Sequence, residues 1–157
     1  MGDPFNRFAL RYPAAVICGL ALLLCHGAVR GGPLAVLAPQ CPSPWELGKL
    51  GFWPVLAAWG LTGRLGRERR PLVRDLPAAV LVPLGMASAC WALEAAGGCG
   101  AGSLGIWAAL LAAGMAVSPN GERHPELWRG LALLLAALYT VLTFFPPDWG
   151  PFVNPLG

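Results

Sequence analysis

The residues of this chain best suited to chemistry follow a Ser-Pro-Trp-Glu segment. Glu46, Lys49 and Trp53 are separated by three and four residues, a spacing that places them on one face of an α-helix. Glu46 and Lys49 could work as a functional ion pair in a pocket. They also have structural interpretations, Glu46 as a cap at the positive end of the helix and Lys49 as an interfacial lysine paired with Glu46. A functional ion pair and an interfacial lysine paired with Glu46 both place the two side chains in contact.

Other polar residues fall near the ends of apolar segments. His26 could titrate near neutral pH, and ionisable groups at membrane depth usually face a bundle interior or water. The plainer alternatives are that His26 bonds to a neighbouring helix or headgroup and that Glu94 faces interfacial water. We therefore predict a candidate outer-side polar cluster of His26, Arg30, Glu46, Lys49 and Glu94. Hydroxyl groups could be added by Tyr139, Thr140 and Thr143.

The cysteines form no metal-binding pattern, since no C-x-x-C occurs and His26 and His124 lie far apart. No metal, cofactor, nucleophile–base pair or phosphate-binding glycine loop is expected. Cysteines inside apolar runs usually act as small apolar side chains, which describes Cys18, Cys25 and Cys90. A disulfide between the loop residues Cys41 and Cys99 stays open, and only for an oxidising compartment.

The composition indicates lipid as the solvent of this protein. Hydrophobic residues make up 56% of the chain and charged residues 12%, against roughly 25% charged residues in soluble domains. The net charge of +3 is too small to indicate nucleic acid, and five arginines lie between Arg64 and Arg74. Membrane lipid is therefore the expected partner, and nucleic acid is not.

The elements that must position these residues are apolar helices. A spanning helix needs about 20 mainly apolar residues, and the sequence predicts an all-α, single-domain integral membrane bundle (1–157) of about five transmembrane helices. Their expected ranges are 12–29, 44–63, 76–96, 102–117 and 126–145. Asp75 is the expected N-cap of the third helix. The first segment also allows a cleaved signal peptide, although His26 occupies a position where a small residue is expected.

Local signals are clearest in the second helix. Ser43, Pro44 and Glu46 form a capping box, with Ser43 as N-cap. Pro54 lies inside the helix and lacks an N–H, so it should free the carbonyl of Leu50.

The fourth helix carries small residues at intervals of four, namely Gly105, Ala109 and Ala113. Such a stripe lets another helix approach closely in lipid, so it is a candidate surface for a homo-oligomer.

The distribution of basic residues predicts the orientation, because cytoplasmic loops are enriched in Lys and Arg. With the N-terminus in the cytoplasm of a cell membrane, only Arg30 and Lys49 lie outside. Nine arginines then lie inside: Arg7, Arg11, Arg64, Arg67, Arg69, Arg70, Arg74, Arg123 and Arg129.

The segment from Pro39 to Leu50 resembles an uncharacterised family of small bacterial membrane proteins, which carries a Pro-x-Asn-Glu-Ser-x-Trp-Glu-His-x-Lys-like pattern. Residues that match are Pro39, Ser43, Trp45, Glu46 and Lys49, whereas Cys41, Pro42 and Leu47 replace the Asn, Glu and His. The stretches 143–147 and 152–155 resemble the family's C-terminus, with Asn154 where an Asp is usual. The resemblance implies a multi-span membrane protein without a known activity, and a polar site altered by the missing Glu and His.

Three classes of function fit this sequence. The leading hypothesis is a membrane protein of unknown biochemical function that acts as an interaction or self-associating component. An enzyme acting on a lipid or small apolar substrate at the outer interface is the first alternative, and it requires the polar side chains to converge on one pocket. A small-solute transporter is the second, and it requires a polar path near the midplane, where the sequence offers little.

Overall fold

The fold is all-α in the part of the chain that the computed structural model describes, namely residues 4–25, 32–40, 43–65, 71–96, 102–117, 124–148 and 152. These ranges contain no strand. The helices are α1 (Pro4–Leu24), the short 3₁₀ helix η2 (Pro33–Val36), α2 (Pro44–Leu65), α3 (Pro71–Ala95), α4 (Gly102–Val117) and α5 (Pro125–Phe144). The predicted fold class is therefore confirmed as all-α with five α-helices.

The predicted boundaries hold for α2, α4 and α5 to within two residues. The other two helices begin earlier than expected, α1 at Pro4 and α3 at Pro71. Asp75 therefore lies inside α3, and its assignment as N-cap was wrong. Proline is well suited to the first position of a helix, where its missing N–H costs nothing, and Pro71 provides that start one turn upstream of the apolar run.

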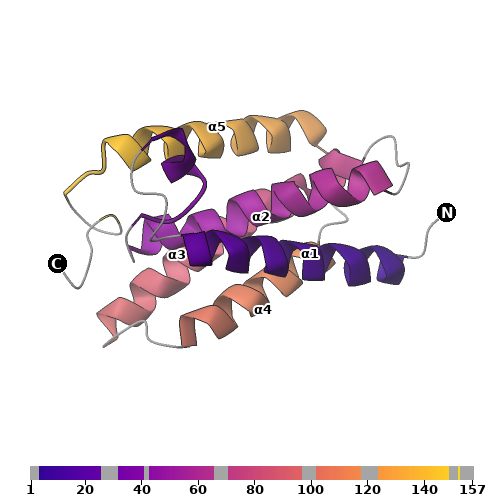
Figure 1. Cartoon of the computed structure of the whole chain (residues 1–157), viewed down its shortest axis with the longest axis horizontal. Helices are drawn as coiled ribbons and strands as arrows, with labels where there is room; N and C mark the ends of the chain where they lie inside the picture. Colours follow the sequence, from indigo (N-terminus) through magenta and orange to yellow (C-terminus); the bar gives the residue numbers. More distant parts are fainter. Residues whose placement is uncertain are drawn as a thin grey trace.

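The helix α2 is the centre of the bundle. It packs most extensively against α3 and α1, while α4 packs against α3 and α1, and α5 packs against α3 and η2. In Figure 1, α5 and α4 lie at opposite edges of the bundle with α2 between them. Residues on α2 can therefore contact every other described element.

Close helix approach depends on glycine at two positions of α2. A Cβ atom on Gly51 would lie 3.0 Å from the backbone nitrogen of Pro83 in α3, and one on Gly48 would lie 2.5 Å from the Tyr139 hydroxyl of α5. Both distances are shorter than a packed side chain tolerates. Gly51 thus lets α3 pack directly against the backbone of α2, and Gly48 makes room for the Tyr139 side chain of α5.

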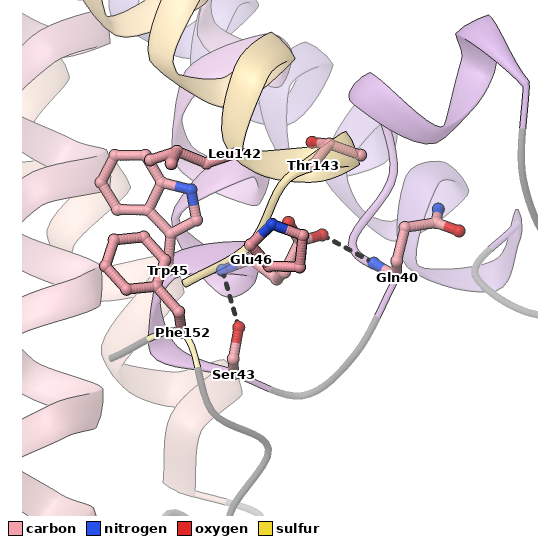
Figure 2. Close-up of a pocket in the computed structure, with 8 residues that line it drawn as sticks. Gln40, Ser43, Trp45, Glu46, Leu142, Thr143 and Phe152 are labelled. Atoms are coloured by element: carbon pink, nitrogen blue, oxygen red, sulfur yellow. Dashed lines mark hydrogen bonds between the residues drawn. The ribbon is translucent and has the colours of Figure 1, made fainter. Parts of the chain in front are cut away.

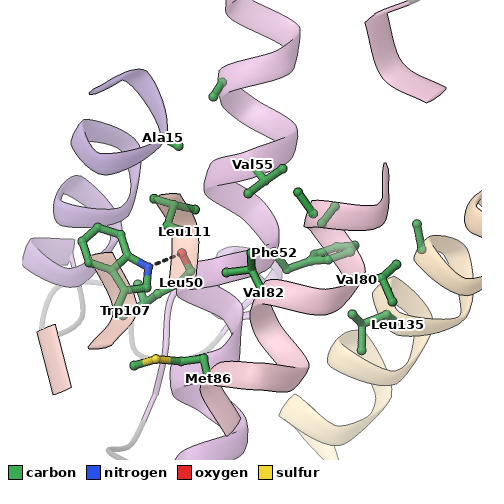
Figure 3. Close-up of a cluster of buried hydrophobic side chains, with 14 of the residues drawn as sticks. Ala15, Leu50, Phe52, Val55, Val80, Val82, Met86, Trp107, Leu111 and Leu135 are labelled. Atoms are coloured by element: carbon green, nitrogen blue, oxygen red, sulfur yellow. Dashed lines mark hydrogen bonds between the residues drawn. The ribbon is translucent and has the colours of Figure 1, made fainter. Parts of the chain in front are cut away.

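The core holds one polar interaction among apolar side chains, shown in Figure 3. Trp107 of α4 is 3% exposed and donates a hydrogen bond from Nε1 to the Leu50 carbonyl over 2.9 Å. This is the carbonyl that Pro54 was predicted to free. In hydrocarbon a proline inside a helix is tolerated where a neighbouring helix satisfies the freed group, and Trp107 does so here.

Within the described ranges, two helices are long and apolar enough to cross a membrane, Leu76–Ala95 of α3 and Pro125–Phe144 of α5. The apolar parts of α1 (Phe8–Leu24) and α4 (Ser103–Ala116) are shorter. Large apolar side chains also cover outer faces of the bundle: Ile17 and Leu24 of α1, Leu81 and Trp91 of α3, and Leu133, Leu134 and Val141 of α5 are each more than half exposed.

The bond between Trp107 and Leu50 predicts a specific rescue. Trp107→Phe leaves the Leu50 carbonyl without its donor, and an unsatisfied buried acceptor costs about 1–3 kcal/mol of unfolding free energy. Pro54→Ala gives residue 54 an N–H that can bond Leu50 within the helix. Trp107→Phe should therefore lower the unfolding free energy less in the Pro54→Ala background than in the wild type. A double-mutant cycle of unfolding in detergent micelles measures the difference. An equal loss in both backgrounds would contradict this account of Pro54.

Candidate functional site

Four parts of the chain meet at one end of the bundle, and Figure 2 shows their side chains. They are segment 32–40, the first turn of α2, the last turn of α5 and Phe152. The hydrogen bond that joins α2 to α5, from Lys49 to Thr143, links residues that are 94 positions apart in the sequence. The site therefore exists only in the folded bundle.

The N-terminus of α2 is capped by Ser43. The Glu46 N–H donates to Ser43 Oγ over 3.3 Å, and the Leu47 N–H donates to the Ser43 carbonyl over 3.0 Å. The Glu46 carboxylate does not complete the predicted capping box on Ser43. It accepts instead from the Gln40 N–H, at 2.8 Å from Oε2. Glu46 thereby ties the chain ahead of the helix to its first turn.

Lys49 is fully buried, with 0% of its side chain exposed. Its Nζ donates to Glu46 Oε2 and to Thr143 Oγ1, each over 2.6 Å, and to the Ala35 carbonyl over 3.4 Å. An ammonium has three N–H donors. The acceptors named here come from α2, α5 and η2, so Lys49 joins three elements.

The polar face of α2 continues to Trp53, whose Nε1 donates to the Val36 carbonyl over 2.8 Å. Glu46, Lys49 and Trp53 thus share one helical face, as their spacing predicts, and all three bond to segment 32–40. Backbone groups of a non-helical segment must be satisfied inside a bundle. This face of α2 satisfies successive carbonyls of Ala35 and Val36.

Aromatic rings close the apolar side of the site. The Trp45 ring centroid lies 4.8 Å from that of Tyr139 and 5.2 Å from that of Phe152. Trp45 Nε1 is buried and has no hydrogen-bond acceptor among the described residues. Trp45 therefore packs between α5 and Phe152.

These parts enclose a small cavity, which we call the end cavity, of about 90 Å³. It has a polar wall and an apolar wall, and both are visible in Figure 2. Its lining residues are Gln40, Ser43, Trp45, Glu46, Leu142, Thr143, Pro146 and Phe152.

The predicted polar cluster is present in part. Glu46 and Lys49 meet, whereas Glu94 does not line the end cavity and lies half-buried near the end of α3. His26 and Arg30 lie outside the described residues, as do Cys41 and Cys99 of the candidate disulfide.

Hydroxyls on α5 were predicted from the sequence, and Thr143 and Tyr139 do reach this site. Thr140 is exposed and donates to the Ala136 carbonyl of its own helix. Sequence reasoning missed Gln40 and the carbonyls of Ala35 and Val36. These contacts are made by backbone groups, which every residue has, so the sequence does not mark them. The one pattern that indicated a partner was the polar face of α2.

The chemistry that this arrangement allows is limited. Lys49 is held by three acceptors, so its ammonium is neither a free base nor a nucleophile. No group of three or more His, Cys, Asp or Glu residues that could hold a metal ion occurs within the described ranges. The geometry is that of a structural ion pair beside a small cavity.

No protein family, curated protein or solved structure matches the chain. The resemblance of the Pro39–Leu50 segment to a bacterial membrane family stays a prediction.

The burial of Lys49 predicts a large effect of its removal. Lys49→Met leaves the Glu46 carboxylate buried without its counter-ion, and breaking a buried pair in this way costs about 3–5 kcal/mol of unfolding free energy. Adding Glu46→Gln should recover much of that loss, because the uncompensated charge disappears. Unfolding in detergent micelles measures both effects.

The chain offers a matched control in the exposed pair of Glu126 and Arg129, which has the same i, i+3 spacing and an N–O distance of 2.7 Å. Arg129→Met should change the unfolding free energy by no more than about 1 kcal/mol, since exposed pairs contribute little. Similar losses for Lys49→Met and Arg129→Met would refute a structural role for the buried pair.

Proposed function

We propose that this protein is a multi-span integral membrane protein of the cell membrane, with a cytoplasmic N-terminus, that acts as a binding component rather than an enzyme. The observation that carries the proposal is the distribution of side chains. Large apolar residues cover the outside of the helices, while the charges of Glu46 and Lys49 are paired inside. A soluble monomer rarely exposes apolar patches of this extent.

The lengths of the other helices support the proposal that α1, α2 and α4 span the membrane as well as α3 and α5. The apolar part of α1, Phe8–Leu24, has 17 residues, the lower limit for a span. The 22 residues of α2 correspond to about 33 Å at 1.5 Å per residue, and its charged residues near the first turn are paired. The 16 residues of α4 fall one short of that limit, so α4 is the shortest span of the proposed five.

The orientation rests on the two ends of α2. Glu46 and Lys49 occupy its first turns, and Arg64 lies at its opposite end, where the arginine-rich stretch begins. Since arginine-rich loops stay in the cytoplasm, the ion pair and the end cavity then face the outer interface.

A binding role is favoured over catalysis by the state of Lys49. An enzyme at this interface would need an ionisable group free to exchange protons or attack a substrate. Lys49 is saturated with acceptors, and Glu46 is the counter-ion that keeps it buried. At this end of the bundle, the end cavity is the feature of the described residues that could interact with another molecule.

Membrane insertion is tested by fractionation and by reporter fusions. The full chain should stay in the membrane pellet after extraction at high pH without detergent, because its apolar helices cannot dissolve in water. With five spans, a reporter active only outside the cytoplasm should be inactive when joined after Arg67 and active when joined after Gly157. Recovery of the chain in the aqueous fraction, or activity after Arg67 instead, would contradict the proposal.

Self-association is a second candidate function, and the exposure of the α4 stripe favours it. Gly105, Ala109 and Ala113 are all exposed in the single chain, and a Cβ atom on Gly105 would meet nothing within 4 Å. This small-residue face is therefore open to a second copy.

A bulky residue on that face should separate the copies. Ala109→Leu should reduce energy transfer between labelled chains in lipid vesicles several-fold, because helices joined through small residues need close backbone contact. Ala137→Leu on α5 is the matched control, since Ala137 is also small and exposed. Unchanged transfer in Ala109→Leu would exclude an interface at the α4 stripe.

A further inference from the structure

We propose that the end cavity binds an organic ammonium group, such as the one carried by an ethanolamine- or choline-type lipid headgroup or by a free amine. The inference rests on the proposed function, which places this end of the bundle at the outer membrane surface. It names the ligand class that the walls of the cavity favour.

Apart from the Trp45 indole N–H, which has no acceptor among the described residues, the donors of α2 around the end cavity are engaged. Helix N-termini attract anions through unpaired N–H groups, but α2 begins at Pro44, which has none. The N–H groups of Glu46 and Leu47 both donate to Ser43. Lys49 lies behind the cavity wall and donates to its three acceptors. An anionic ligand would therefore find few donors here.

Acceptors are present in excess. The hydrogen bonds that described residues donate to the Glu46 carboxylate all end on Oε2, which leaves Oε1 available, and Glu46 lines the cavity. The Gln40 side chain, which Figure 2 shows directed away from Glu46, donates through Nε2 to the Ala38 carbonyl. A ligand that donates hydrogen bonds matches this wall.

The end of α5 adds a favourable field for a positive charge. Leu142 and Thr143, in its last turn, line the cavity. The last carbonyls of a helix carry a partial negative charge. Pro146 and Pro147, which follow the helix, have no N–H to offer these carbonyls. A cation in the cavity would lie at this negative helix end.

The apolar wall completes the fit. Trp45 and Phe152 line the cavity with ring centroids 5.2 Å apart, and aromatic faces attract ammonium groups within about 6 Å. The volume of about 90 Å³ is several times the roughly 10–15 Å³ that a cavity needs to hold one water molecule. This is enough for an ammonium group with its attached carbons and too small for a whole lipid headgroup.

The test uses the full chain in detergent micelles and follows its thermal unfolding. Tetramethylammonium chloride and ethanolamine hydrochloride are titrated against sodium chloride at equal ionic strength. Both amines should raise the unfolding temperature of the wild type, and sodium chloride should not. Phe152→Leu keeps an apolar wall but loses the aromatic face, so the apparent affinity should fall roughly two- to fivefold.

Phe145→Leu is the matched control, because Phe145 is 78% exposed and does not line the cavity. It should respond to the amines like the wild type. The proposal would be overturned if the amines did not raise the unfolding temperature of the wild type. It would also be overturned if Phe152→Leu bound them with unchanged apparent affinity.

A second experiment distinguishes a lipid headgroup from a free amine as the ligand. The protein is purified from vesicles that contain equal amounts of phosphatidylethanolamine and phosphatidylglycerol, and native mass spectrometry identifies the lipid that it retains. Retained phosphatidylethanolamine that Phe152→Leu reduces identifies the headgroup as the source. An amine response without retained lipid identifies a free amine. Preferential retention of phosphatidylglycerol, reduced by Phe152→Leu, would overturn the ammonium assignment. Membrane insertion is measured separately by fractionation, so failure of either proposal is recognisable.

Discussion

The buried ammonium of Lys49 sets the conditions that the rest of this bundle must meet. A charge without water is tolerated only when it is paired and its donors are satisfied. The acceptors come from Glu46 on the same helix, Thr143 on α5 and the Ala35 carbonyl beside η2. Because no single element can supply all three, α5 and segment 32–40 must both close against α2 at this end.

The need to satisfy buried polar groups also explains the hydrogen bonds of two tryptophans that lie in different parts of the bundle. Trp53 donates to the Val36 carbonyl at the end of the short 3₁₀ helix η2, and Trp107 donates to the Leu50 carbonyl that Pro54 leaves open. In each case an indole N–H satisfies a backbone oxygen that has lost its regular partner. An indole suits this task since most of its surface is apolar and only one atom is polar.

The sequence predicted the helices well because apolar length and proline positions act locally. It also predicted the shared face of Glu46, Lys49 and Trp53 and the open carbonyl of Leu50. It could not predict what that face contacts, since the partners are backbone groups of segment 32–40, which carry no side-chain signature. The starts of α1 and α3 differ from the prediction because both helices extend upstream of their apolar runs, to Pro4 and Pro71, and proline suits the first position of a helix.

The position of the end cavity follows from the way the ion pair is satisfied. Glu46 uses Oε2 for both Lys49 and the Gln40 N–H, which draws segment 32–40 toward α2 and turns one carboxylate oxygen away from the pair. Trp45, one residue earlier, then points to the neighbouring side and packs against Phe152 with its ring tilted by 49°. A carboxylate oxygen and two aromatic rings are thus left around one small space. The group that stabilises the fold also gives this space its preference for a positive ligand, so binding and bundle closure depend on the same carboxylate.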